Sequence, residues 1–366
     1  MNRRTFVVLA SIAVVLGLLA VLGQNRTGTG TIAGDTAGQP LLPGFQADAQ
    51  DIGSVSITGA GGERLVTLER SDTGWTVAEQ DDYPAKSADV NSLLIAIAEA
   101  AIVEEKTANP GFHARLGVEA IETADAAGVQ LVLTSTGGSN FATVILGDAY
   151  TATQRYARLV DSDQSVLIDR NPDIARDPAD WVEPAIIDIA GERVQRVEIV
   201  HADGERVVLR KSLRSDTDFL VDDIPEGREL QYTSIGNVTG SALQGLELDE
   251  VAAAAATELP NEVATVIYST FDGLIITITI ATDDGEDPWL RFGAHFDAEQ
   301  ALAFATEPVD PVTADNSIEA ADDPIAEAEA VNAALAAWRY RIPSFKYSQL
   351  TRRMEDLLLT VTAASE

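Results

Sequence analysis

Short runs in which apolar and polar residues alternate dominate the chain from residue 52 onward. Val55 and Ile57 alternate with Ser and Thr, residues 59–62 are rich in glycine, and Val66 and Leu68 alternate on the return. A period of two indicates half-buried β-strands, and the glycines between them predict a hairpin. The same reasoning predicts further strands at residues 75–77, 129–133, 142–146, 156–160 and 166–168.

One segment of this first region has helical spacing instead. Its apolar positions recur every three or four residues over residues 88–101, namely at Val90, Leu93, Leu94, Ile97 and Ala101. Such a stripe predicts a helix with one face turned toward the core. The first region is therefore expected to combine an antiparallel β-meander with one helix.

The same order of elements returns later in the chain. Residues 197–199 followed by 204–208 resemble residues 55–57 followed by 62–66, at an offset of 142 residues. An aromatic strand at residues 219–221, a helix around residues 235–243 and a strand at 246–248, comparable to 102–104, are expected next. Strands at 263–268, 274–280 and 289–292 complete the pattern. These parallels predict an α+β fold of two repeated units, residues 52–185 and 186–366.

The C-terminal part departs from this pattern. Residues 306–324 are acidic and contain Pro308, Pro311 and Pro324, which predicts an extended insertion. Residues 325–337 are rich in Ala and Glu and are expected to be helical, and a last helix is expected over residues 348–359.

The N-terminus carries the features of a membrane anchor. Arg3 and Arg4 precede an apolar run over residues 6–22, in which Ser11 is the one polar side chain. A helix of this length spans about 26 Å, close to the thickness of a bilayer core. The positive-inside rule then keeps the N-terminus cytoplasmic and places the body on the other side. A cleaved signal peptide is the alternative, but Val21-Leu22-Gly23 is a poor cleavage site.

Residues 1–23 are accordingly predicted to be a single-pass anchor in a bacterial inner membrane, with the body in the periplasm. Residues 24–51, rich in Gly, Thr, Ala and Asp, are expected to form a flexible linker.

Charge and composition narrow the function. The chain has 25 Lys and Arg against 58 Asp and Glu, a formal net charge of −33. Such a charge repels phosphate backbones and argues against nucleic-acid binding. The absence of Cys removes disulfides, thiolate metal sites and cysteine nucleophiles.

Motifs for catalysis or cofactor binding do not emerge. The three histidines, His113, His201 and His295, lack metal-ligand spacing and are expected at surfaces or turns. The sequence contains neither a nucleophile elbow nor a phosphate-binding loop with Lys and Ser or Thr. The paired acidic residues fall in predicted turns and are interpreted as solvated loops, and the tryptophans as core anchors. The chain is therefore expected not to be an enzyme and to bind neither a cofactor nor a metal.

A group of cations near the C-terminus is the candidate binding site. In so acidic a chain a local group of basic residues is conspicuous, and it is a candidate for contact with an acidic partner. Pairing within the chain, with Glu355 and Asp356, is an equally good interpretation. The candidate residues are Trp338, Arg339, Arg341, Lys346, Arg352 and Arg353.

The order of several short motifs resembles a family. They are residues 40–44, Gly74-Trp75, 103–110, 114–118, 145–147, Trp181 with 186–189, and 338–347 before 351–358. The chain resembles a bacterial domain-of-unknown-function family whose members are often encoded beside gliding-motility-type ABC transporter subunits. This resemblance implies a membrane-tethered extracytoplasmic protein that works with a transporter or envelope complex, and it supplies no catalytic residues.

The function expected from these observations is that of a non-enzymatic accessory or scaffolding subunit of such a complex. The alternatives are a hydrolase of envelope polymers with a carboxylate pair and a protein that binds a small ligand between the two repeats.

Overall fold

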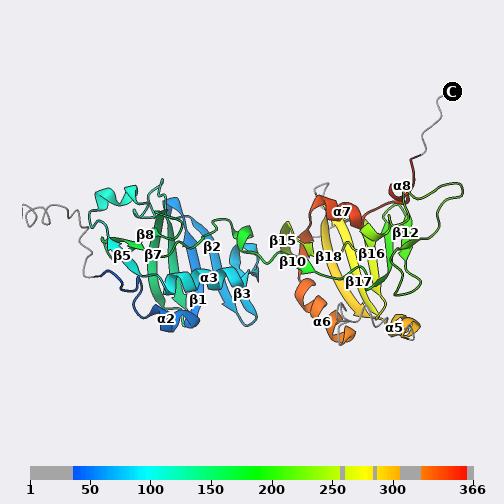
Figure 1. Ribbon diagram of the computed structural model, residues 1–366, viewed down its shortest axis with the longest axis horizontal. Helices are drawn as coiled ribbons and strands as arrows, with labels where there is room; N and C mark the ends of the chain where they lie inside the picture. Colours follow the sequence, from blue (N-terminus) through cyan, green and yellow to red (C-terminus); the bar gives the residue numbers. More distant parts are fainter. Residues whose placement is uncertain (1–35, 256–259, 283–286, 306–322, 361–366) are drawn as a thin grey trace, which may run out of the picture. The chain divides into compact units, whose positions relative to one another are not determined.

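The protein is described by a computed structural model that covers residues 36–255, 260–282, 287–305 and 323–360 (Figure 1). The chain divides into two compact units between Val182 and Glu183, whereas the sequence placed the boundary after residue 185. Helices occur with antiparallel sheets, so the prediction of an α+β fold is confirmed at this level. The expected anchor at residues 1–23 lies outside the described residues. Among the residues described, no helix is both long and apolar enough to cross a membrane.

Unit 1 is built on a nine-stranded antiparallel sheet in the order β4-β3-β2-β1-β6-β7-β8-β9-β5. Its strands are β1 Ile52–Thr58, β2 Arg64–Ser71, β3 Gly74–Val77, β4 Tyr83–Pro84, β5 Ile102–Glu105, β6 Val129–Ser135, β7 Asn140–Ala149, β8 Arg155–Leu159 and β9 Ser165–Ile168. The alternation seen in the sequence sets its two faces: Val55, Ile57, Val66 and Leu131 are fully buried, while Ser54, Ser56 and Thr67 lie on the opposite, accessible face.

The helix α3, Ser87–Ala98, covers the apolar face of this sheet (Figure 1). Its buried side chains, Val90, Leu93, Leu94 and Ile97, are four of the five that the helical spacing indicated, and the fifth, Ala101, lies beyond the end of the helix. Beside it lie α2, Phe45–Asp48, and the 3-10 turn η1, Ala49–Asp51.

The described part of the expected linker is folded onto unit 1, which corrects that expectation for residues 36–51. The side chains of Leu41, Leu42 and Phe45 are buried. The amide of Leu41 donates to the carbonyl of Ala100 at 2.7 Å, and Gly38 donates to Ile102 at 2.7 Å. The glycines and prolines of this segment hid these apolar residues from composition-based reasoning.

Unit 2 contains an eight-stranded antiparallel sheet in the order β13-β12-β11-β16-β17-β18-β19-β15. Its strands are β11 Val194–His201, β12 Arg206–Arg210, β13 Leu220–Val221, β15 Glu250–Ala253, β16 Asn261–Thr270, β17 Leu274–Thr282, β18 Trp289–Phe296 and β19 Trp338–Arg341. A separate pair joins β10, Ala185–Ile187, to β14, Leu246–Glu247. The described helices are α4 Asn237–Gly240, α5 Ala298–Phe304, α6 Pro324–Leu335, α7 Ser344–Leu350 and α8 Met354–Leu357.

The two sheets have the same strand order. With β4 set aside, β3-β2-β1-β6-β7-β8-β9-β5 corresponds position by position to β13-β12-β11-β16-β17-β18-β19-β15. The strand at the position of β5 is β15, Glu250–Ala253, and not residues 246–248 as the sequence suggested, because Leu246 pairs with β10 instead.

Two expected helices are shorter than predicted. The helix expected around residues 235–243 is one turn, α4, because Gly236, Gly240 and the β-branched Val238 and Thr239 disfavour a longer helix. A Cβ on Gly240 would lie 2.2 Å from Cε2 of Phe219, so this turn lies close against that ring. The last helix is divided into α7 and α8 by residues 351–353.

A loop of unit 1 lies directly on the sheet, and glycines make this contact possible. The chain between β5 and β6 contains the 3-10 helix η4, Pro110–Arg115. Leu116 and Gly117 follow η4 directly. A Cβ on Gly147 would lie 2.2 Å from the carbonyl oxygen of Leu116, and a Cβ on Gly128 would lie 2.2 Å from that of Gly117. Any side chain at these two glycines would therefore push the loop away from β6 and β7.

Gly147→Ala tests this contact. The added methyl group meets backbone that cannot rotate away, so we expect a loss of about 1–3 kcal/mol in the free energy of unfolding, measured by chemical denaturation. Gly137→Ala is the matched control, because its Cβ would meet only Ser135 Oγ at 3.7 Å. Equal stability of the two variants would contradict the close approach.

Candidate functional site

The cations proposed as a partner-binding site are arranged around unit 2 as internal contacts. Arg339 and Arg341 lie on β19 with their guanidinium carbons 4.4 and 4.3 Å from the centre of the Trp289 ring. Arg341 also forms a 2.6 Å ion pair with Glu250 on the neighbouring strand β15. Trp289 and Arg339 are buried, and Trp338 is half-buried. These contacts join β18, β19 and β15 through stacking and charge.

The remaining three cations hold the last segments of the chain. Lys346 donates to the carbonyl oxygens of Ala242 and Gln244 at 3.0 and 2.7 Å, and burial lowers the pKa of its amine. Arg353 pairs with Asp203 at 2.8 Å and with Glu205, both in the turn after β11. Arg352 donates to the carbonyl of Ile235 at 3.4 Å.

Pairing within the chain therefore occurs, but with other carboxylates than expected. Glu355 accepts two bonds from Arg228, at 3.0 and 2.9 Å, and the side chain of Asp356 accepts the backbone N–H of Arg353. Binding of an acidic partner by these cations stays a prediction, and their geometry favours a structural role.

Two of the three histidines expected at surfaces or turns have buried side chains, His113 in the 3-10 helix η4 and His201 at the end of β11, so a surface position is corrected for both. His113 is 3% exposed and its Nε2 lies 2.9 Å from the carbonyl oxygen of Asp163. His201 is 4% exposed and its Nε2 lies 3.3 Å from the carbonyl oxygen of Arg352. His295 is exposed. Within the described ranges, no three or more His, Asp or Glu side chains are grouped so that they could hold a metal ion.

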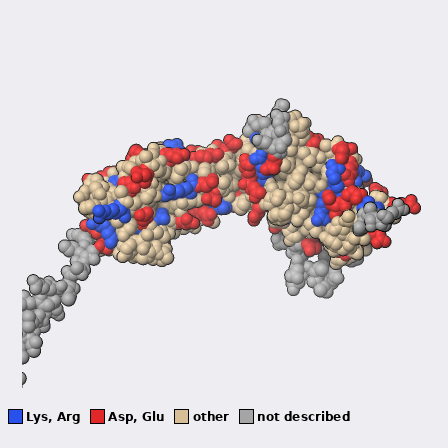
Figure 2. All heavy atoms as spheres, turned by 90° about the horizontal axis from the view of Figure 1, so that it is seen from above, with Lys and Arg blue, Asp and Glu red and all other residues tan. Residues whose placement is uncertain are grey.

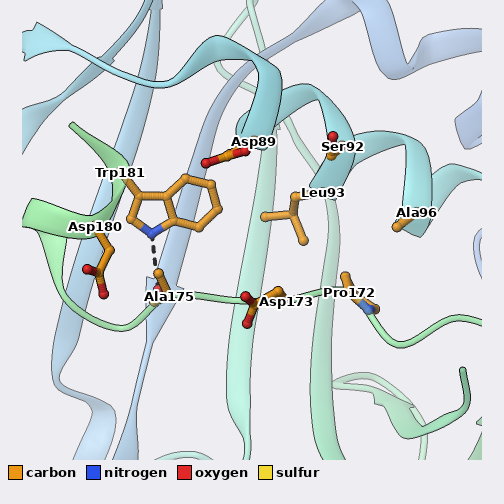
Figure 3. A pocket seen from close by; sticks show the side chains of 9 residues that line it. All are labelled: Asp89, Ser92, Leu93, Ala96, Pro172, Asp173, Ala175, Asp180 and Trp181. Atoms are coloured by element: carbon orange, nitrogen blue, oxygen red, sulfur yellow. Dashed lines mark hydrogen bonds between the residues drawn. The ribbon is translucent and has the colours of Figure 1, made fainter. Parts of the chain in front are cut away.

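A small hollow lies between α3 and residues 172–181 of unit 1 (Figure 3). Asp89 and Ser92 come from the helix, and Asp173 and Asp180 from the loop that faces it. Trp181 between them is 3% exposed and donates its indole N–H to the carbonyl of Ala175 at 3.1 Å. The hollow has a volume of about 220 Å³, below the usual size of ligand pockets. Trp181 is thus a core anchor, as its sequence context predicted.

A larger groove lies on the accessible face of the unit 1 sheet, with a volume of about 610 Å³. Its floor is formed by β2, β1 and β6, which are neighbours in the sheet. The floor side chains are chiefly hydroxyls and an amide: Ser54, Ser56, Thr58, Thr67, Gln130 and Thr134. Arg64, Glu69 and Glu122 add charges of both signs. We call this hollow the hydroxyl groove.

One hydroxyl at the middle of the floor has no internal partner. Ser56 lies opposite Thr67 on β2 and opposite Val132 on β6. Its Oγ is buried and makes no hydrogen bond with the described residues. A buried hydroxyl without a partner costs stability, so such groups are rare outside sites that receive a ligand or water.

Ile121 and Glu122 form one wall of the hydroxyl groove. They belong to the loop between β5 and β6 that approaches Gly128 and Gly147 closely. Behind this wall lies a second hollow of about 400 Å³ that shares Ile121, Glu122 and Gln130 with the groove. Arg158, 6% exposed, holds the wall by donating to the carbonyls of Val118 and Ser162 at 2.8 and 3.0 Å. Burial lowers the pKa of Arg158, but its nearest bonds are to dipoles rather than to carboxylates.

The corresponding face of unit 2 has different chemistry. Glu198 on β11 bonds Arg206 at 2.5 Å and Arg196 at 3.2 Å, and Arg210 pairs with Asp222 at 2.9 Å. Arg196 and Glu198 occupy the positions in β11 that Ser54 and Ser56 occupy in β1. In unit 1 this surface offers free hydroxyls, and in unit 2 its charges satisfy one another.

The hydroxyl groove is not among the sites expected from the sequence. The signal that the sequence does contain is the row of hydroxyl residues that alternate with the buried residues of β1, namely Ser54, Ser56 and Thr58. The wall could not be seen, because it depends on a loop distant in sequence.

Comparison with known proteins gives one match. A family model described as "Domain of unknown function (DUF4340)" matches residues 75–263, slightly more than half of the chain. The match begins in β3 and ends in β16, so it includes parts of both units. No curated protein and no solved structure matches the chain significantly.

The ion pairs of Glu198 with Arg196 and Arg206 in unit 2 predict that the stability of the protein depends on pH. Hydrogen bonds from Arg206, with a further bond from Arg196, lower the pKa of Glu198 below its ordinary value of 4.5. A carboxylate with a lowered folded-state pKa stabilises the fold above its unfolded-state pKa and loses this effect as pH falls through the folded-state value. We expect Glu198→Gln to cost about 0.5–1 kcal/mol at pH 7 and nothing at a pH below the folded-state value.

Chemical denaturation at a series of pH values between 7 and 2.5 measures this difference. Glu226→Gln is the control, because Glu226 is exposed and forms no ion pair with the described residues. A cost of Glu198→Gln that stays constant with pH would show that its charge is not the cause.

Proposed function

Because the chain belongs to the DUF4340 family, a family of domains of unknown function, we propose its role from its surfaces and its N-terminal sequence. The protein is a non-enzymatic accessory or scaffolding subunit, anchored in a bacterial inner membrane by residues 1–23, with its body in the periplasm. Its partners are subunits of a gliding-motility-type ABC transporter or of an envelope complex.

The hydroxyl groove is the observation that carries this proposal. This groove is open and is larger than the hollow beside α3. Ser, Thr and Gln side chains form its floor. Such groups bind a partner by donating and accepting hydrogen bonds and are poor acids, bases and nucleophiles without an activating neighbour. The hydroxyls of Ser54, Thr58 and Thr67 line the groove on half-buried residues, and they gain hydrogen bonds when a polar segment of the partner fills it.

The pKa shifts of the carboxylates also favour binding over hydrolysis. A glycosidase acid needs a raised pKa so that it is protonated at neutral pH. The shifts in Glu198, Asp203 and Glu355 are all downward, and an arginine contributes to each. These carboxylates hold the fold together as anions.

The proposal includes a duplicated body. The shared strand order of the two sheets supports an origin of both units from one α+β ancestor. Unit 1 then has kept a face open for binding, whereas the equivalent face of unit 2 carries paired charges.

Co-purification tests the proposed role. The full chain is purified in detergent from the native membrane after mild cross-linking, and transporter subunits are identified by mass spectrometry. We expect Thr67→Val to reduce the recovered partner several-fold at nearly unchanged stability, because it removes a hydroxyl that lines the groove and keeps the shape of the side chain. Thr67→Arg, which fills the groove, is expected to abolish recovery.

Thr73→Arg, in the exposed turn before β3, is the matched control and is expected to leave recovery unchanged. Recovery of the native protein alone would contradict the accessory role. Recovery that is equal in all variants would contradict the hydroxyl groove as the binding site.

A further inference from the structure

The described chain begins at one edge of the unit 1 sheet. Thr36 donates its hydroxyl to Glu105 Oε1 at 2.7 Å, and the amide of Ile102 donates to the carbonyl of Gln39 at 2.8 Å. Both contacts are to β5, the edge strand. Thr36, the first described residue, therefore lies beside β5, at one edge of unit 1 (Figure 1).

Aromatic and basic side chains gather next to this point. Lys106 directly follows β5, and its amine lies 5.5 and 5.9 Å from the ring centres of Tyr150 and Tyr156. The guanidinium carbon of Arg115 lies 4.9 Å from the centre of Phe112. Lys106, Phe112 and Arg115 line one shallow hollow, which joins the two pairs. We call these five residues the aromatic–cationic cluster.

Phe112, Arg115 and Tyr150 of the cluster are exposed, although exposure of the rings is costly, whereas Lys106 and Tyr156 are half-buried. Phe112 and Tyr150 are 44% and 55% exposed, and Val103 on the neighbouring β5 is 38% exposed. Arg115 is exposed and forms no ion pair with a carboxylate among the described residues, whereas Lys106 pairs with Glu104 at 2.7 Å. Figure 2 shows basic side chains gathered at this end of unit 1, while acidic ones are spread over much of the surface.

This combination fits the headgroup region of a bilayer. Tyrosine and other rings with a polar neighbour prefer the membrane–water interface, and Lys and Arg add attraction to anionic headgroups. On a chain with a formal net charge of −33, most of the remaining surface is repelled by the same headgroups. The aromatic–cationic cluster is therefore a part of the surface that can approach them.

Chain length brings this face within reach. Twelve residues, 24–35, separate the expected anchor from Thr36. They span about 40 Å at most when fully extended, and about 20 Å on average as a flexible chain. A tether this short gives a high effective concentration of the cluster at the bilayer, so weak contacts suffice.

We propose that the aromatic–cationic cluster docks unit 1 onto the anionic surface of the bilayer that holds the chain's own N-terminal anchor. This inference rests on the proposed function for the anchor. Docking restricts the orientation of unit 1 relative to the membrane and thereby the direction in which the hydroxyl groove is presented to a partner.

The experiment uses the absence of cysteine in the chain. Single cysteines are introduced into the full chain as Ala114→Cys, between Phe112 and Arg115, or as Ala179→Cys, in the 3-10 helix η5, Pro178–Trp181. Both alanines are exposed in 3-10 helices of unit 1, so they are matched. A fluorophore on each is quenched by lipids that carry a spin label on the headgroup, in vesicles of phosphatidylcholine with or without 25% phosphatidylglycerol.

We expect quenching at position 114 to exceed that at position 179 at least threefold in vesicles with phosphatidylglycerol and to fall to the level of position 179 without it. Arg115 is exposed, and Arg115→Glu is expected to halve the difference in quenching between positions 114 and 179. Arg115→Glu combined with Phe112→Ser is expected to remove this difference. Circular dichroism verifies that both variants remain folded.

Flotation of the vesicles separates the two proposals. Suppose that the protein floats with the vesicles but quenching is equal at both positions in the presence of phosphatidylglycerol. That result would refute docking and leave the anchor. Quenching at position 114 that stays as strong when phosphatidylglycerol is left out would do the same. A difference unaffected by the two variants would also refute it. Protein that fails to float would refute the anchor and, with it, docking.

Discussion

The contact on which the candidate site depends is the close approach of one loop to the sheet of unit 1. At Gly128 and Gly147 the backbone carbonyls of residues 116–117 occupy space that a side chain would fill. Arg158 on β8 adds a bond to the carbonyl of Val118 in this loop and another to the carbonyl of Ser162 in the turn after β8. The loop covers β7 and β8 but leaves the β2, β1 and β6 face open, and its edge becomes the wall of the hydroxyl groove. The shape of the proposed binding surface thus depends on a packing constraint outside it.

The two units show how one strand order supports different surfaces. The buried positions of β1 and β11 are alike, with Val55 and Ile57 corresponding to Val197 and Ile199, because each must pack against the core of its own unit. The opposite face is free of that requirement. In unit 2, Arg196, Glu198 and Arg206 neutralise one another there, while in unit 1 the hydroxyls lack strong internal partners. The proposed division between a binding unit and a structural unit follows from this difference.

The sequence predicts the strands well because alternation reports directly on burial, and β1, β2, β6 and β16–β18 all lie where it indicated. It predicts less where position depends on distant residues. The offset of 142 residues pairs Val66 with Val208, whereas the ladders pair Val66 with Val207: Ile57 lies opposite Val66 and Ile199 opposite Val207. A bulge between Ile57 and Thr58 causes this one-residue shift. Similarly, Arg353 bonds Asp203 and Glu205, about 150 residues away, so its partners could not be read from neighbouring residues.

Basic residues are scarce in this chain, so the surroundings of each one indicate its role. With 25 Lys and Arg among 58 acidic residues, a cation that meets a carboxylate inside the fold offsets repulsion, and many of those near the C-terminus do so. Arg115 differs, because its described neighbour is the exposed ring of Phe112 rather than a carboxylate. In an acidic chain such an arrangement retains positive charge at the surface beside an apolar group. That combination lies close to Thr36, where the described chain begins, and the proposed docking onto a bilayer would supply both an anionic and an apolar contact for it.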